Sequence, residues 1–242
     1  MYFSPIFIVV MLVALAIGGL AQLAIRHTNK KYSRVPLANG MTGAEVAWRI
    51  LQANNIASTD GRVGRGSVAI QQVSGSLTDH YDPQSGIVSL SESIYGASSV
   101  AAAAVAAHEV GHAIQDAKGY VFGRLRTSMV PAVNFSSRFS MILIIIGLFL
   151  GAASGVGLGL YAFWIGIILY SLAVLFQIVT LPVEINASHR ALGQLRSLSI
   201  LGPDEISGGR SMLTAAASTY VAAALISLLY LAYYLFLGGR RN

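Results

Sequence analysis

Residues 139–183 read FSMILIIIGLFLGAASGVGLGLYAFWIGIILYSLAVLFQIVTLPV, an unbroken run of 45 residues without Lys, Arg, Asp or Glu. Crossing a hydrocarbon core about 30 Å thick takes roughly 20 apolar residues in a helix, because only a helix satisfies its own backbone polar groups there. The run is too long for one membrane-spanning helix and fits two. The flexible glycines of GAASGVGLG at 151–159 predict a tight hairpin between these two helices.

Two further stretches, residues 1–25 and 211–239, also lack charged side chains. The first predicts a transmembrane helix over about Pro5–Ile25. A cleaved signal peptide fits less well, because no Lys or Arg precedes the apolar run and the run exceeds the roughly 7–15 residues of a signal-peptide core. The second stretch predicts a span over 213–237. We therefore expect an α-helical integral membrane protein with about four transmembrane helices.

The composition excludes several other classes of protein. Only 11% of the 242 residues are charged and 55% are hydrophobic, whereas a soluble domain carries about 25% charged residues. An ordinary soluble enzyme, a disordered tail and, with no Cys, a disulfide-rich secreted domain are excluded. The net charge of +6 does not require a nucleic-acid partner, and we expect none. The basic residues just after the first span favour contact with anionic lipid headgroups instead.

The Lys and Arg residues are concentrated in two of the connections between spans. Residues 26–138 contain 11 of the 16, residues 184–212 contain three, and the tail contains Arg240 and Arg241. Four spans place 26–138 and 184–212 on one side of the membrane. Because positively charged connections stay in the cytoplasm, we expect that side to be cytoplasmic, although the two arginines of the tail argue for the opposite orientation.

The long segment 26–138 is expected to form a small α+β unit at the membrane interface. Its TGAE sequence at 42–45 matches a capping box and predicts a helix over 43–54. Residues 67–73 and 86–91 have the pattern of short strands, and DPQSG between them predicts a turn.

A second helix is predicted over VAAAAVAAHEVGHAIQDAK. Ser98 or Ser99 can cap its start, and Gly119 is a natural stop. It contains His108-Glu109-Val110-Gly111-His112, an HExxH motif on a helix. Histidines at i and i+4 lie only about 40° apart around a helix, so both imidazoles can bind one Zn²⁺ ion.

Glu109 lies beside the first of these histidines, where its carboxylate can reach a zinc-bound water. Zinc lowers the pKa of that water, Glu109 accepts the proton, and the resulting hydroxide attacks a carbonyl. The pattern therefore predicts His108 and His112 as zinc ligands and Glu109 as the catalytic acid/base. The alternative is two helix histidines with other hydrogen-bond partners beside a surface glutamate.

A catalytic zinc usually has three protein ligands and one open position. Glu184 is the expected third ligand, because it follows the third span on the same side of the membrane as the HExxH motif. It is also the first charged residue after 45 uncharged ones, at a depth where a lone carboxylate is costly. Pairing of Glu184 with Arg190 is an alternative to zinc binding. His189 is a rival ligand, but on a helix it would lie about 140° from Glu184.

Three other polar positions have open interpretations. Ser188 and Asn186 lie near Glu184, and either could hold a ligand in place without binding the metal. The cluster Asp79-His80-Tyr81-Asp82 could supply a hydrogen-bond donor to a transition state from His80 or Tyr81, or it could be a structural turn. The sequence does not decide between these roles.

Five blocks, in order, carry a family resemblance: the N-terminal anchor, TGAEVAWRIL, LTDHYDPQSGIVSLSESIYG, VAAHEVGHAIQDA and LPVEINASHRAL. Together they resemble the bacterial neutral zinc metallopeptidases of the inner membrane, the YugP-type family. The resemblance covers nearly the whole chain. It implies a zinc peptidase of the bacterial inner (plasma) membrane, with His108 and His112 as ligands, Glu109 as acid/base and Glu184 as third ligand.

More distantly, the chain is similar to the heat-shock membrane proteases and the prenyl-protein proteases. Those relatives pair HExxH with a later helical Glu that is followed, four residues on, by Asp. Here that position is Ser188, so the resemblance does not supply a partner for His108.

The predicted function is a membrane-embedded zinc metallopeptidase acting on a protein or peptide substrate, one associated with the membrane. We expect the strand at 86–91 to align that substrate by main-chain pairing, as edge strands do. Two alternatives are a non-proteolytic membrane scaffold with structural zinc and a zinc hydrolase of a lipid or another amide. The presence of Glu109 argues against the scaffold, because a structural zinc site needs no base.

Overall fold

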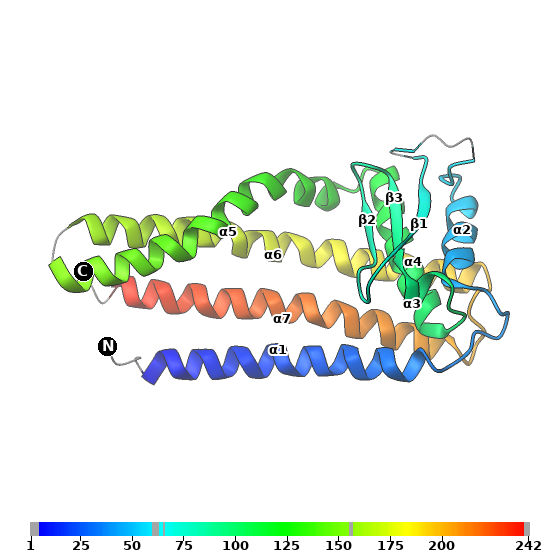
Figure 1. The fold of residues 1–242 in the computed structure, drawn as a ribbon, viewed down its shortest axis with the longest axis horizontal. Coiled ribbons are helices and arrows are strands. Elements are labelled where there is room, and N and C mark those ends of the chain that lie inside the picture. The colour runs from blue at the N-terminus through cyan, green and yellow to red at the C-terminus, as the bar shows by residue number, and fades with distance from the viewer. Residues whose placement is uncertain (1–4, 60–62, 65, 155–156, 240–242) are drawn as a thin grey trace. The chain divides into compact units, whose positions relative to one another are not determined.

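Four long helices make up most of the computed structural model. The described residues are 5–59, 63–64, 66–154 and 157–239. The long helices are α1 (Pro5–Tyr32), α5 (Val121–Ser154), α6 (Gly157–Ser197) and α7 (Ile206–Gly239) (Figure 1). Each is long and apolar enough to cross a membrane, and in α5 the candidate span is Val121–Leu150. The prediction of a helical membrane protein with four spans is confirmed.

The long helices extend beyond the uncharged stretches of the sequence. Helix α5 begins 18 residues before Phe139, and α6 continues past Glu184 to Ser197. The predicted glycine-rich hairpin is also shorter than expected, since α5 runs to Ser154 and α6 starts at Gly157. The two residues between these helices lie outside the described part of the chain. Glu184 therefore lies within a continuous helix.

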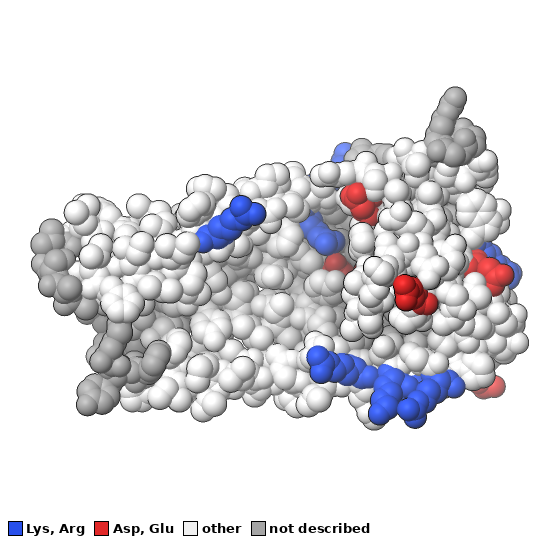
Figure 2. All heavy atoms as spheres, in the orientation of Figure 1, with Lys and Arg blue, Asp and Glu red and all other residues white. Residues whose placement is uncertain are grey.

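The chain divides into two compact units. The span unit comprises Met1–Leu20, Leu125–Leu181 and Tyr220–Asn242, and the polar unit comprises Ala21–Arg124 and Pro182–Thr219. Most of the charged side chains visible in Figure 2 belong to the polar unit, as the sequence also requires. Each unit is described below by itself.

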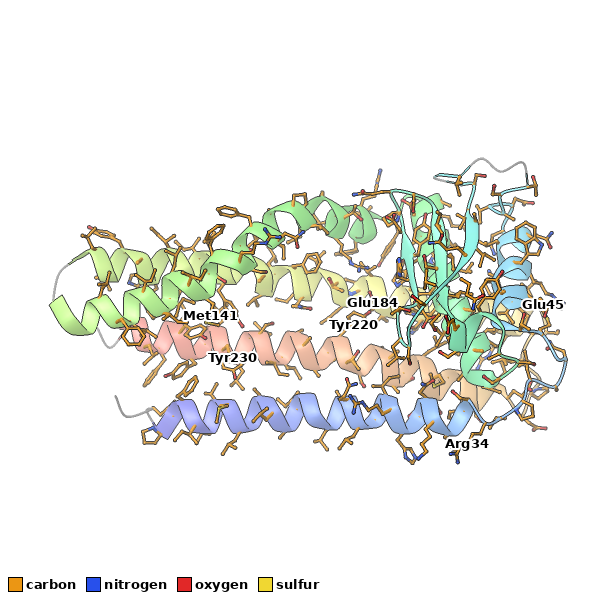
Figure 3. All side chains as sticks on the ribbon, in the orientation of Figure 1. Arg34, Glu45, Met141, Glu184, Tyr220 and Tyr230 are labelled. Carbon is orange, nitrogen blue, oxygen red and sulfur yellow. The ribbon has the colours of Figure 1, made fainter. Side chains whose placement is uncertain are left out.

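Helices in the span unit pack through aromatic and small residues. Phe163 and Ile144 are buried together with Tyr234, whose neighbours Met141 and Tyr230 are labelled in Figure 3. Large apolar side chains elsewhere in the unit stay exposed, including Leu158 at 76%. Helices that pack closely inside while exposing apolar side chains outside are typical of proteins whose solvent is lipid.

The polar unit contains a three-stranded sheet in the order β1-β3-β2. Strand β1 (Ala69–Val73) pairs in parallel with β3 (Ile87–Ser91), and β2 (His80–Asp82) pairs antiparallel to β3. The two predicted strands are β1 and β3, whereas the three-residue β2 was not predicted. The expectation that 86–91 is a substrate-aligning edge strand is wrong, because β3 is paired on both sides.

Helix α2 (Gly43–Ala53) has the predicted capping box. The Thr42 backbone N–H donates to Glu45 Oε2 at 2.8 Å, and the Glu45 N–H donates to Thr42 Oγ1 at 3.3 Å. A short helix, α3 (Glu92–Tyr95), follows β3 and was not predicted. Four residues are too few for a periodic pattern to be visible in the sequence.

Helix α4 (Val100–Ala117) is the centre of the polar unit and is buried along most of its length. Ser99, one of the two predicted caps, accepts a hydrogen bond from the Ala102 N–H at 3.1 Å. Gly119 ends the helix with φ of +62°, a conformation that glycine adopts without strain. The alanines of α4 pack against α2 and the sheet in one core with Val46, Ile50 and Leu90.

A glycine sets the distance between α4 and α6. A Cβ atom added at Gly111 would lie 2.7 Å from the backbone oxygen of Ala187, closer than real Cβ contacts come. The three nearest atoms all belong to the Ala187 backbone, so the contact could be relieved only by moving a helix. Gly111 is also the fourth residue of the HExxH motif, so this close approach occurs between the motif and the turn of α6 that follows Glu184.

We predict that Gly111→Ala destabilises the polar unit by about 1–3 kcal/mol, because overpacking against a backbone forces the helices apart. It should also lower the amount of zinc retained after purification. Gly193→Ala is the matched control, since Gly193 lies on α6 with nothing within 4 Å of its added Cβ. That change should be neutral or stabilise by up to about 1 kcal/mol. Chemical unfolding in detergent measures both, and equal stability of the two variants would contradict the prediction.

Candidate metal centre

Helices α4 and α6 bring two histidines and one carboxylate together. His108 Nε2 lies 3.2 Å from Glu184 Oε2, and His112 Nε2 lies 3.4 Å from the same oxygen. The two imidazole centroids are 4.8 Å apart with ring planes at 86°, and one ligand atom from each of the three residues lies within 4.8 Å of the others. Glu184, labelled on α6 in Figure 3, is 1% exposed. The three expected ligands thus form one buried group.

His112 is oriented by a glutamine that the sequence reasoning missed. Its Nδ1 lies 3.1 Å from Gln115 Oε1, so the Nδ1–H tautomer donates to Gln115 and leaves Nε2 facing Glu184. Gln115 in turn donates from Nε2 to the Val183 carbonyl at 2.8 Å and to Asn186 Oδ1 at 3.0 Å. Its position three residues after His112, on the same helix face, was the available signal.

His108 is held by a serine. Ser188 Oγ lies 3.3 Å from His108 Nδ1, and both side chains are buried. The Ser188 hydroxyl can accept the Nδ1–H and keep Nε2 directed at Glu184. Asn186, the other residue considered for this role, acts on the opposite side through Gln115.

The sequence left two alternatives at Glu184: His189 as a rival ligand and Arg190 as an ion-pair partner. His189, the rival ligand, is exposed on α6 and is not part of the group that could hold a metal. Arg190 donates from Nε to Asn186 Oδ1 at 2.7 Å, so it supports the amide that holds Gln115. In the described part of the chain, the ligand-type atoms that converge are those of His108, His112 and Glu184.

Glu109 is buried beside this group. Burial is the main cause that raises the pKa of its carboxyl to about 7. The carboxylates of Glu184 and Asp79 act in the same direction, while His108 and His80 oppose the shift. A carboxyl whose pKa lies near neutrality can both accept and release a proton at physiological pH. Its place in the motif and its surroundings therefore suit an acid/base role.

Most of the Asp79–Asp82 cluster has structural contacts. Asp79 accepts from the Ser91 N–H at 2.7 Å, and the Tyr81 hydroxyl donates to Asp116 at 3.1 Å. Asp82 accepts from the N–H of Gln84 at 2.9 Å, which forms the predicted turn. These bonds tie β2 to β3 and to α4.

His80 is the residue of that cluster whose side chain is exposed and also acts on the pKa of Glu109. Its Nδ1 lies 2.8 Å from the Thr78 carbonyl, the ring is exposed, and its charge lowers the pKa of Glu109. An imidazole near the acid/base is a candidate hydrogen-bond donor to substrate. Tyr81, the other candidate from the sequence, directs its hydroxyl to Asp116 instead.

The donor set fits Zn²⁺. Two imidazole nitrogens and one carboxylate oxygen are the ligands of many catalytic zinc sites, which keep a fourth position open. A carboxylate that is 1% exposed is costly to bury without a cation, and a divalent ion at the His–His–Glu group would neutralise it. The hydrogen bonds at both Nδ1 atoms are the kind that fix the tautomer of zinc-bound histidines.

Comparison with known proteins agrees with this chemistry. A family model described as "Putative neutral zinc metallopeptidase" matches residues 7–238. The chain is 43% identical over 237 residues to "Putative membrane protease YugP" of Bacillus subtilis (strain 168), which covers 97% of this chain and 98% of that protein. No solved structure matches. The family resemblance recognised in the sequence is confirmed, and zinc is the metal that the family and the buried His–His–Glu group support.

We predict that Glu184→Ala loses most of its zinc. Partners that only orient a ligand change metal affinity by roughly 10–100-fold, so removal of a ligand should lower it by more than about 100-fold. Glu92→Ala is the control, because Glu92 is an exposed glutamate in the same unit. Metal content of the purified proteins, followed by chelator competition, measures the effect. Full retention of zinc by Glu184→Ala would exclude Glu184 as a ligand.

Proposed function

We propose that this chain, which belongs to the neutral zinc metallopeptidase family, hydrolyses peptide bonds at the site formed by His108, His112, Glu184 and Glu109. The observation that carries the proposal is the convergence of the three ligand atoms with a buried carboxyl next to them. A zinc site with a structural role needs only ligands. A base held near neutrality beside the ligands supports hydrolysis instead.

The residues of the chain divide the chemical work. Zinc, when bound, lowers the pKa of a coordinated water and polarises the carbonyl of the scissile bond. Glu109 accepts the proton released by the attacking water. As the carbon–nitrogen bond breaks, Glu109 gives this proton to the departing amine nitrogen and returns to its ionised form. His80, whose charge acts on the pKa of Glu109, can donate a hydrogen bond to the oxygen of the substrate carbonyl as negative charge develops there.

Strand β2 is the better candidate for aligning a substrate. It lies at one edge of the sheet. Its first residue, His80, and the residue before it, Asp79, both act electrostatically on Glu109. An edge strand offers unpaired backbone N–H and C=O groups to an extended peptide. A peptide paired along β2 would pass next to the acid/base. The proposed substrate is thus a protein or peptide that binds in an extended conformation. We expect it to be associated with the same membrane that α6 and α7 cross.

We predict that Glu109→Gln keeps its zinc and loses activity, by roughly 10²–10⁴-fold in kcat, because Gln cannot accept the proton. Cleavage of a general protein substrate by the detergent-solubilised enzyme measures the rate, and metal analysis confirms the site. The control is Glu45→Gln, which alters the cap of α2 and no metal-site residue. Unchanged cleavage by Glu109→Gln would disprove the mechanism, and zinc loss would instead assign Glu109 to binding.

In a bacterial plasma membrane, the distribution of Lys and Arg supports an orientation with the polar unit on the cytoplasmic side. The absence of Cys makes this orientation directly testable. We predict that Gln84→Cys, in the exposed β2–β3 turn, reacts with a membrane-impermeant maleimide only after the cells are opened. Leu158 is exposed at the start of α6, whereas Glu184 lies in the second half of that helix. Leu158→Cys should therefore react in intact cells. The reverse pattern would place the site outside the cytoplasm.

A further inference from the structure

The polar unit contains a cavity beside the metal centre, and Ser188 is the residue that the two share. The cavity has a volume of about 470 Å³ and lies between α6 and α7. Its apolar lining includes Ile185, Leu192 and Leu213, and its basic lining consists of His189, Arg196 and Arg210. We call this cavity the α6–α7 groove. It combines an apolar wall with cationic groups.

The charges of the groove have one sign. None of the described residues that line it is acidic, and the side chains of Arg196 and Arg210 are exposed. The two guanidinium groups in one groove repel each other unless an anion lies between them. Arginine binds phosphate through two parallel N–H donors, which makes a phosphate group a good match for this end of the groove.

The helices that form the groove continue into apolar segments. The residues before Glu184 on α6 are uncharged as far back as the start of the helix, and those after Arg210 on α7 are uncharged through Gly239. The groove therefore lies at the point along both helices where charged residues give way to spans. That point is where the headgroups of a bilayer meet its acyl chains.

We propose that the α6–α7 groove binds an anionic phospholipid. The phosphodiester lies between Arg196 and Arg210, and an acyl chain lies against Ile185, Leu192 and Leu213. An apolar wall of this kind has no use in binding free phosphate. The inference is independent of the proposed peptidase activity, because it is tested by lipid binding alone.

Native mass spectrometry of the zinc-loaded protein, released from vesicles of phosphatidylglycerol and phosphatidylcholine in equal amounts, tests the proposal. The wild-type protein should retain phosphatidylglycerol in preference to phosphatidylcholine. The double variant Arg196→Gln/Arg210→Gln should retain at least about 10-fold less, because each cation near an anionic membrane contributes substantially to binding. Thr214→Trp keeps every charge and fills the groove, so it should lower retention as well.

Lys118→Gln/Arg124→Gln is the matched control, because it removes two exposed cations of the polar unit that neither line the groove nor follow the first span. It should retain phosphatidylglycerol as the wild type does. Zinc content verifies that each variant is folded. Equal retention by the wild type and the arginine variant would overturn the proposal. Equal loss in the Lys118→Gln/Arg124→Gln control would also overturn it, because it would point to general surface charge. Unchanged retention by Thr214→Trp, or full displacement of the lipid by millimolar inorganic phosphate, would overturn it too, because either result would point to a free anion rather than a lipid.

Discussion

The burial of one carboxylate is the constraint on which the polar unit depends. Glu184 is 1% exposed on a helix that has just passed through a long uncharged stretch. An unpaired charge in that place is strongly destabilising, so the fold must supply a cation or protonated partners. His108 and His112 are within 3.4 Å of its Oε2, and together the three residues have the composition of a zinc site. The two imidazoles that compensate this buried carboxylate are thus the same residues that, together with it, could hold a metal ion.

The remaining architecture places α4 against α6 at the required distance. The small side chains of α4 bury nearly the whole helix, and Gly111 permits backbone contact with Ala187. Gln115 then spans the same interface, since it bonds both His112 on its own helix and the Val183 carbonyl on the other. Packing and hydrogen bonding therefore act on the same pair of helices. A change that separates them would disturb both histidines at once.

Local patterns in the sequence were sufficient to predict the main helices and the residues of the candidate metal centre. The capping box before α2, the serine before α4 and the HExxH spacing depend on residues within a few positions of one another, and all are observed. Strand order depends on contacts between distant residues, and no local pattern contains it. The three-residue β2 and the central place of β3 were therefore missed. Gln115 was missed because its role requires α6 beside it.

Helix α6 shows how one segment can carry two separate functions. Glu184 and Ser188 are four residues apart and face α4, and Ala187, Ala191 and Leu195 are buried with them on that side. Ile185, His189, Leu192 and Arg196 repeat at the same helical spacing, one position later, and line the groove. A step of one residue rotates a helix by about 100°, so the metal ligand and the lipid-facing cations point in different directions. Ser188 alone belongs to both sets, since it contacts His108 and also lines the groove. A lipid in the groove would therefore lie next to the hydroxyl that contacts His108.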